Sequence, residues 1–311
     1  MSGKIIILGE YFAICGCSCI AAPLDYKCEV TLSDEINVKN DNARNSIDIV
    51  RCNIDINDAI SEYKISANFL IPMGYLLKIL CEECKLNPAR QLSIDLMSEV
   101  PIGRGLGSST SISVAFMSSF LMKYDRGFEK CFLGEMINRV DQIFHGGMVS
   151  GVDSRVILEN KTIKYRRCDC GIGVEFLDEV EISIFLIDTN TTRSVMEFLP
   201  ELIGHICKDH VMLNEVDEIV NSAWKSIKCG YKRELEDAIY ENWNMLRKYL
   251  NVENRVLEIM MECTELGYRA VKLLGGKNGT IMIYHPKSDY LDLIEYSERA
   301  NLKYKIIHIK R

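Results

Sequence analysis

The stretch "PIGRGLGSSTSISVAF", residues 101–116, holds three glycines and five hydroxyl residues directly before an apolar run at helical spacing. The segment before it, "QLSIDLMSEVP", alternates polar and apolar residues like a strand and stops at Pro101. Glycines let backbone N–H groups approach oxygen atoms, and a helix N-terminus attracts anions. We therefore predict a phosphate-binding loop made of Gly103, Arg104, Gly105, Leu106, Gly107, Ser108, Ser109, Thr110 and Ser111.

Two common phosphate-binding loops do not fit this stretch. A Walker A loop needs Lys directly after its last glycine, where this chain has Ser108. The dinucleotide fingerprint G-x-G-x-x-G would place its third glycine at the same position, and the loop lies far from the N-terminal strand. A flexible turn before a core helix stays open as an alternative, with the glycines serving only backbone geometry. If the loop binds phosphate, the positive charge must come from elsewhere in the chain.

The composition limits the classes of partner. At 311 residues the chain exceeds what one compact core usually organises, so we expect two domains or one large α/β unit. The 37 Lys and Arg against 44 Asp and Glu give a net charge of -7 without a long basic block, which argues against a nucleic-acid partner. The apolar start is short for a signal sequence, and no stretch reaches the roughly 18 apolar residues of a membrane span. We expect a cytoplasmic protein that does not enter a membrane.

The 13 cysteines favour neither a disulfide framework nor a zinc site. In a chain of this size without a secretory signal, we expect most of them to be reduced and to pack as small hydrophobic residues. Cys15, Cys17 and Cys19 alternate as one face of a strand would, and Cys81 and Cys84 form a lone CxxC without a second pair at zinc-finger spacing.

Hydrophobic periodicity predicts an alternation of sheet and helix along the chain. We expect strands over 4–8, 18–32, 91–100, 180–190, 269–286 (two strands around a glycine turn) and 302–309. We expect helices over 66–85, from the glycine loop onward, and over 128–144, 194–206, 208–227, 231–249 and 253–266. A change of pattern near 178–182 suggests two domains, 1–178 and 179–311.

The loop resembles the P-x-x-x-G-L-G-S-S signature of the GHMP small-molecule kinases. Two further segments agree in order: "SGKIIILGEYFAICG" is similar to the N-terminal P-G-K-x-x-x-x-G-E motif, and "VKLLGGKNGTIMI" is similar to the C-terminal K-L-T-G-A-G-G-G-G motif. The resemblance implies an α+β two-domain GHMP kinase fold, with an N-terminal domain of the ribosomal-protein-S5-like type and a C-terminal ferredoxin-like domain. It also implies ATP as the co-substrate, with Mg²⁺.

Within that superfamily, two stretches resemble the mevalonate kinases. "FHGGMVSGVDSRV" is similar to their H-G-x-P-S-G-V-D-N stretch, and "LIDTNTTRSV" is similar to a strand that ends L-x-x-T-N-T and is followed by Arg. The resemblance implies phosphorylation of the 5-hydroxyl of mevalonate in isoprenoid biosynthesis, by a protein that could form a homodimer.

The resemblance also implies a role for individual residues. Asp153 would face the acceptor hydroxyl and Lys4 would stabilise the charge that develops during transfer. Ser109 and Asp141 would hold magnesium, since Mg²⁺ prefers hard oxygen ligands. The acceptor would contact Arg193, whose guanidinium suits a carboxylate. Further acceptor-site candidates are Glu10, Tyr11, His145, Ser150 and Gly151, and the C-terminal glycine loop is Gly275, Gly276 and Gly279.

Three departures from the family pattern keep other functions open. Tyr11 stands where mevalonate kinases usually have His, and Gly-Glu-Tyr is more typical of phosphomevalonate kinases. Asp141 replaces a Glu, and the segment 275–279, "GGKNG", has fewer glycines than the family motif. The alternatives are therefore phosphomevalonate kinase or another GHMP kinase, and a non-catalytic nucleotide-binding descendant. A nicotinamide dehydrogenase is a distant third, because the dinucleotide fingerprint is mismatched.

Overall fold

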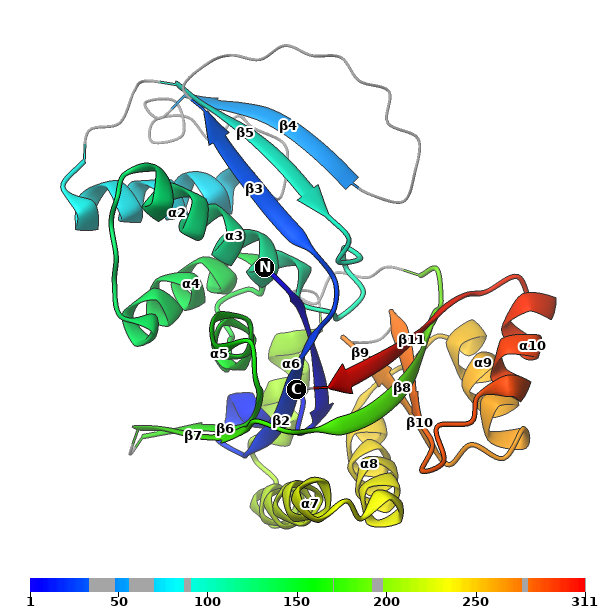
Figure 1. The fold of residues 1–311 in the computed structure, drawn as a ribbon. Coiled ribbons are helices and arrows are strands. Elements are labelled where there is room, and N and C mark those ends of the chain that lie inside the picture. The colour runs from blue at the N-terminus through cyan, green and yellow to red at the C-terminus, as the bar shows by residue number, and fades with distance from the viewer. Residues whose placement is uncertain are drawn as a thin grey trace. The chain divides into compact units, whose positions relative to one another are not determined.

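A computed structural model describes residues 1–33, 48–55, 70–86, 91–169, 171–191, 198–275 and 279–310 (Figure 1). The chain divides into two compact units that interleave along the sequence. Unit 1 comprises residues 1–3, 25–101 and 107–159, and unit 2 comprises residues 4–24, 102–106 and 160–311. The boundary expected near 178–182 lies inside unit 2, whose last segment begins at residue 160. The N-terminal strands belong to the same unit.

Unit 1 consists of an antiparallel sheet with helices on one face (Figure 1). The strand order is β3-β5-β4, with the bounds β3 (Cys28–Ser33), β4 (Asp48–Asp55) and β5 (Gln91–Ser98). The helices are α2 (Leu70–Cys84), α3 (Ser108–Lys123), α4 (Lys130–Phe144) and α5 (Val152–Glu159). Every residue of α3 from Thr110 to Met117 is buried, including Ser111 and Ser113. The helix that follows the glycine loop is therefore central to the unit, and not an amphipathic surface helix.

Unit 2 contains two four-stranded sheets. The first has the order β1-β2-β6-β7, with the bounds β1 (Gly3–Leu8), β2 (Cys19–Leu24), β6 (Thr162–Cys168) and β7 (Gly171–Leu177). The second has the order β11-β8-β10-β9, with the bounds β8 (Glu181–Asp188), β9 (Ala270–Leu274), β10 (Thr280–Tyr284) and β11 (Lys303–Lys310). All residues of β9 and β10 are buried, which explains why these strands read as near-continuous apolar runs.

The helices of unit 2 follow the predicted periodicity closely. Their bounds are η1 (Phe12–Cys15), α6 (Leu199–Ile206), α7 (His210–Cys229), α8 (Lys232–Leu246), η3 (Arg247–Tyr249), α9 (Asn254–Glu265) and α10 (Leu291–Arg299). Helix α7 is capped at both ends: the Asp209 side chain accepts from the Met212 N–H at 3.0 Å, and Gly230 adopts the left-handed conformation after the last turn. Helix α10, like α5 in unit 1, was not predicted.

The cysteines differ from expectation at two points. Cys15 and Cys207 form a disulfide with a Cα–Cα distance of 5.3 Å, which the expectation of mostly reduced thiols did not include. Cys15, Cys17 and Cys19 do not share a strand face, because Gly16 turns the chain with φ of 90° between the end of η1 and the start of β2. Cys81 and Cys84 are free thiols in α2, and burial raises the pKa of Cys81 to about 11.

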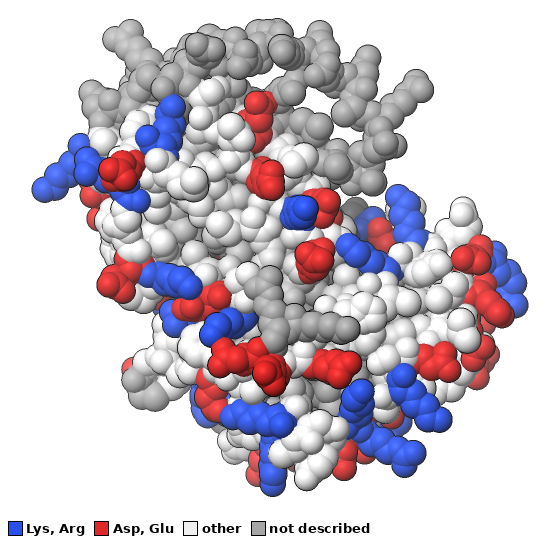
Figure 2. Space-filling model, in the orientation of Figure 1, with Lys and Arg blue, Asp and Glu red and all other residues white. Residues whose placement is uncertain are grey.

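Among the described helices, none is long and apolar enough to cross a bilayer. On the face drawn in Figure 2, the described Lys and Arg side chains are interspersed with Asp and Glu. This mixture agrees with the slightly acidic net charge of the sequence.

Candidate active site

The glycine loop takes its shape from alternating left-handed residues. Gly103, Gly105 and Gly107 have φ of 70°, 77° and 77°, a region that costs other residues about 1–2 kcal/mol. Gly107 is the N-cap of α3, and no side chain in the described part of the chain caps this helix. The first intrahelical bond is the one from the Ser111 N–H to the Gly107 carbonyl, at 2.9 Å. The preceding N–H groups at this helix end have no intrahelical acceptor, so they suit an anion.

The four hydroxyl residues that begin α3 separate into two pairs. The Thr110 hydroxyl donates to Asp141 Oδ2 at 2.7 Å, and Ser111 Oγ donates to the carbonyls of Ser2 and Gly107 at 2.8 and 2.7 Å. Both side chains are fully buried, so their hydroxyls serve the fold of unit 1. Ser108 and Ser109 are half-buried at the end of the helix, where a ligand could reach them.

Two buried hydrogen bonds link the helices of unit 1 that carry the predicted carboxylates. The Thr110–Asp141 bond joins α3 to α4, and Asp141 is only 3 % exposed. Ser154 Oγ donates to Asn138 Oδ1 at 2.7 Å, which joins the first turn of α5 to the turn of α4 before Asp141. Asp153 lies in that first turn of α5 and is partly exposed. Ser109, Asp141 and Asp153 are therefore carried by three helices that are hydrogen-bonded to one another.

The segment between the two carboxylates is a turn that leads directly into a helix. His145 is the C-cap of α4, and its N–H donates to the Asp141 carbonyl at 2.9 Å. Ser150 Oγ accepts from the Val152 N–H at 3.3 Å, and Gly151 has φ of 86°. Helix α5 begins at Val152, within the "GVDS" stretch, so Asp153 occupies a helical position.

Ser109 and Asp141 have the right chemistry for magnesium. A hydroxyl and a carboxylate are hard oxygen donors, and Mg²⁺ completes its octahedron with phosphate oxygens and water. The Thr110 hydrogen bond to Oδ2 orients the Asp141 carboxylate at the end of α3. No cluster of three or more His, Cys, Asp or Glu that could hold a metal occurs among the described residues, so a metal here would depend on a bound phosphate ligand.

In unit 2, the strand that carries Lys4 is tied to the glycine loop. The Lys4 N–H donates to the Leu106 carbonyl at 3.0 Å. This hydrogen bond joins β1 to Leu106, the last residue of the glycine loop that belongs to unit 2. Lys4 is 6 % exposed, an unusual burial for a lysine. The backbone of Lys4 is thus fixed to the glycine loop within unit 2.

The two glycine motifs of unit 2 pack backbone against backbone. A Cβ atom built on Gly105 would lie 2.5 Å from Gly275 Cα, and one built on Gly275 would lie 2.2 Å from Gly105 Cα. Such a contact leaves no room for any side chain. This explains why Gly275 is present in the shortened C-terminal motif. Gly279 is also described, whereas Gly276 lies outside the described residues.

We expect Gly275→Ala to destabilise the protein more than Gly230→Ala does. The two glycines have φ of 68° and 69°, so both substitutions carry the same backbone penalty. Only Gly275 has a neighbour within reach of a Cβ, since nothing lies within 4 Å at Gly230. Overpacking costs about 1–3 kcal/mol, and this is the expected excess for Gly275→Ala in urea unfolding. Equal unfolding free energies for the two variants would show that the loops do not pack this closely.

Glu10 forms an ion pair with Lys272 of β9. Lys272 is wholly buried, and its Nζ also donates to the β1 carbonyls of Ile7 and Ile6 at 3.0 and 3.4 Å. Burial lowers the pKa of Lys272, and the Glu10 carboxylate opposes that shift. The positive charge of Lys4 also lowers the pKa of Lys272, because the two ammonium groups repel one another. Glu10, predicted to be an acceptor-site residue, is thus a partner of Lys272, which sequence reasoning did not single out.

Tyr11, the residue after Glu10, has a strained backbone conformation, with φ of 60°. Its ring meets the Phe198 ring edge-on, with centroids 6.3 Å apart. Bulky residues rarely adopt positive φ, so the surrounding structure must enforce it. Arg193, the predicted partner of the acceptor carboxylate, lies outside the described residues.

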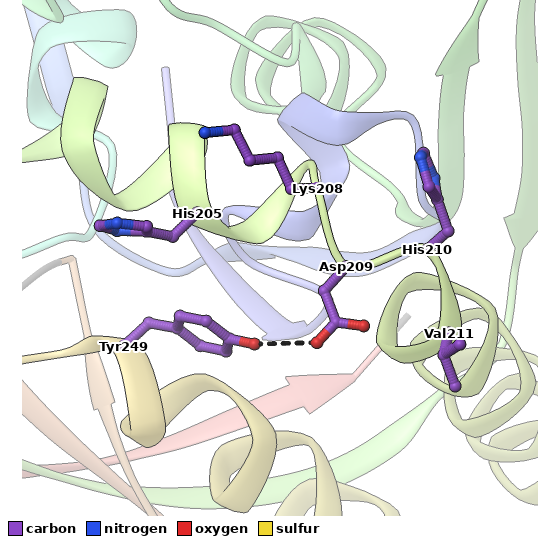
Figure 3. A pocket seen from close by; sticks show the side chains of 6 residues that line it. All are labelled: His205, Lys208, Asp209, His210, Val211 and Tyr249. Carbon is purple, nitrogen blue, oxygen red and sulfur yellow. Dashed lines mark hydrogen bonds between the residues drawn. The ribbon is translucent and has the colours of Figure 1, made fainter.

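A hollow of about 650 Å³ near the junction of α6 and α7 contains none of the predicted site residues (Figure 3). It is lined by His205, Lys208, Asp209, His210, Val211 and Tyr249. Figure 3 shows the two histidines on opposite sides of Asp209. Asp209 is already engaged as the α7 cap and as the acceptor of the Tyr249 hydroxyl at 3.2 Å. These residues stabilise a helix junction, and we do not assign the chemistry to this hollow.

The central part of the chain matches a family of known proteins. Residues 73–158, which include the glycine loop, Asp141 and Asp153, match the GHMP kinases N terminal domain. The chain has a GHMP kinase fold. The structure of the Methanococcus jannaschii mevalonate kinase superposes with a TM-score of 0.78 at 14 % identity, over 100 % of this chain and 97 % of that one. The expected α+β two-domain GHMP fold is therefore confirmed.

The GHMP fold by itself does not determine the acceptor. The Lactococcus lactis galactokinase, in a complex with galactose, superposes with a TM-score of 0.74 at 11 % identity, over 99 % of this chain and 92 % of that one. In sequence, the Pyrococcus abyssi mevalonate kinase is 23 % identical to this chain, over 90 % of this chain and 85 % of its own length.

Proposed function

We propose that this chain transfers the γ-phosphoryl group of ATP to the 5-hydroxyl of mevalonate, giving 5-phosphomevalonate and ADP, in isoprenoid biosynthesis. The observation that carries the proposal is the uncapped N-terminus of α3 behind the GLGSS loop, hydrogen-bonded through Thr110 to the helix that carries Asp141. The choice of acceptor is supported by the "SGVD" stretch and by relatives that are named mevalonate kinases.

In the proposed reaction, the acceptor oxygen forms a bond to the γ-phosphorus as the bond from that phosphorus to the bridging oxygen of ADP breaks. Asp153 takes the hydroxyl proton, which orients the oxygen and raises its nucleophilicity. The Lys4 ammonium stabilises negative charge on the transferring group. The free N–H groups at Ser108–Thr110 bind phosphate oxygens.

Magnesium bound with ATP would neutralise phosphate charge in this reaction. Ser109 and Asp141 are the residues that would hold it, because they combine hard oxygen donors with a place at the phosphate-binding helix end. The absent P-loop lysine is then replaced by several sources of positive potential: the helix N-terminus, the metal and Lys4.

The proposal is tested by measuring acceptor-dependent ADP release from Mg-ATP. Mevalonate, phosphomevalonate and galactose are supplied in parallel, and the product is identified by ³¹P and ¹H NMR. We expect turnover with mevalonate and a phosphate ester on C5. Turnover with phosphomevalonate alone would identify a phosphomevalonate kinase, the alternative that Gly-Glu-Tyr at residues 9–11 also favours. Tight ATP binding without ADP release for any acceptor would identify a non-catalytic descendant.

A further inference from the structure

Arg104 belongs to the phosphate loop, yet its guanidinium is directed to the end of β8. Arg104 Nε lies 2.9 Å from Asp188 Oδ1, and Nη1 donates to the Thr191 carbonyl oxygen. The Arg104 side chain is only 12 % exposed. A planar guanidinium that is held at two edges has a fixed orientation, which a lysine could not reproduce.

Asp188 also organises the turn that receives this arginine. Asp188 Oδ1 accepts from the Asn190 N–H at 2.8 Å, and Asn190 has φ of 56°. Thr189, which follows Asp188, donates to the Gly279 carbonyl through its N–H at 3.0 Å and through its hydroxyl at 2.6 Å. The turn over residues 188–191 is thus attached to the C-terminal glycine turn on one side and to the phosphate loop on the other.

The opposite charges of Arg104 and Asp188 indicate that Arg104 positions the loop and does not bind phosphate. The Asp188 carboxylate is 27 % exposed and directly contacts Arg104, so it neutralises the loop cation that would otherwise attract phosphate. If Arg104 were a phosphate ligand, Asp188 would compete with ATP for it, and removing the carboxylate would strengthen ATP binding. If Arg104 holds the loop in place through Asp188, the same change would weaken ATP binding.

We propose that Arg104 and Asp188 are a positioning pair that fixes the phosphate loop to the turn after β8 in the shape that ATP requires. This inference rests on the proposed nucleotide-binding function of the loop and does not depend on the acceptor. The side chain at position 104 acts on ATP through the backbone of Gly103 and Gly105, which the pair holds, and not by direct contact.

The test is the dissociation constant of Mg-ATP for Arg104→Met, Arg104→Lys, Asp188→Asn and the double variant Arg104→Met/Asp188→Asn, measured by calorimetric titration without acceptor. We expect each single variant to bind about tenfold more weakly, and the double variant to bind no more weakly than either single one, because both changes remove one interaction. In turnover, KM for ATP should rise about tenfold while kcat changes less than twofold.

The exposed pair Arg255 and Glu258, on one face of α9, provides matched controls. Arg255→Met and Glu258→Gln should leave ATP affinity unchanged. Tighter ATP binding by Asp188→Asn, or wild-type affinity in Arg104→Lys, would overturn the proposal. So would a loss of unfolding free energy in the single variants with unchanged ATP affinity, which would indicate a purely structural pair. ATP binding without mevalonate turnover would instead overturn only the proposed acceptor.

Discussion

Asp153→Asn should abolish most turnover while leaving the fold and ATP binding intact. Asn keeps the shape of the side chain but cannot accept the proton of the acceptor hydroxyl. General acid–base catalysis contributes about 10²–10⁴-fold, so we expect kcat to fall by at least about 100-fold. The residue lies in the first turn of α5, which the Ser154–Asn138 hydrogen bond joins to α4.

The measurement is kcat together with the dissociation constant of Mg-ATP and the urea unfolding curve. Asp178→Asn is a suitable control, because Asp178 is 78 % exposed and its ion pair with Lys161 lies at the surface. Near-wild-type turnover by Asp153→Asn would exclude Asp153 as the catalytic carboxylate. A parallel loss in the Asp178 variant would show that the assay reports general damage.

Lys272→Met should cause a large loss of stability. It leaves the Glu10 carboxylate, which is 6 % exposed, without its cation. Removing one partner of a buried ion pair costs about 3–5 kcal/mol, because the remaining charge stays buried and uncompensated. We expect a decrease of this size in the free energy of unfolding measured with urea. Neutralising both partners, in Lys272→Met/Glu10→Gln, should restore a large part of it.

The exposed pair Lys78 and Glu82 on α2 serves as the comparison, with side chains that are 48 % and 65 % exposed. Lys78→Met should change stability by no more than about 0.5 kcal/mol, since exposed pairs of this spacing contribute little. Two results would contradict a buried ion pair between Lys272 and Glu10. Lys272→Met could lower the free energy of unfolding no more than Lys78→Met does, or the double variant could be less stable than Lys272→Met.

Local sequence patterns predicted the elements that carry the candidate residues of unit 1 better than the contacts of those in unit 2. The glycine loop, the start of α3 and the register of Asp141 on α4 depend on periodicity and helix-end preferences that act over a few residues. The partners that orient these groups were not predicted. Thr110 was assigned to phosphate, whereas its hydroxyl holds Asp141, a contact between two helices that no local pattern encodes.

In unit 2, the missing information was long-range pairing. Lys272 lies in an apolar run, "AVKLL", and a charged residue inside a buried strand is a signal that a buried partner exists. The sequence could not identify Glu10 as that partner. The hairpin of β6 and β7 was missed because β7 has exposed positions on both faces, so its pattern lacks the alternation of a half-buried strand.

The interleaving of the units has a consequence for how the protein can be made. The strands β1 and β2 are synthesised well before β6, which is the neighbour of β2 in the sheet. Pairings between distant segments close long loops and slow the search for the native state. A fragment that ends near residue 178 would lack the Lys272 partner of Glu10, and one that begins there would lack β1. We therefore expect that β1 and β2 complete their sheet only after β6 has been made, and that neither fragment contains all the contacts of unit 2.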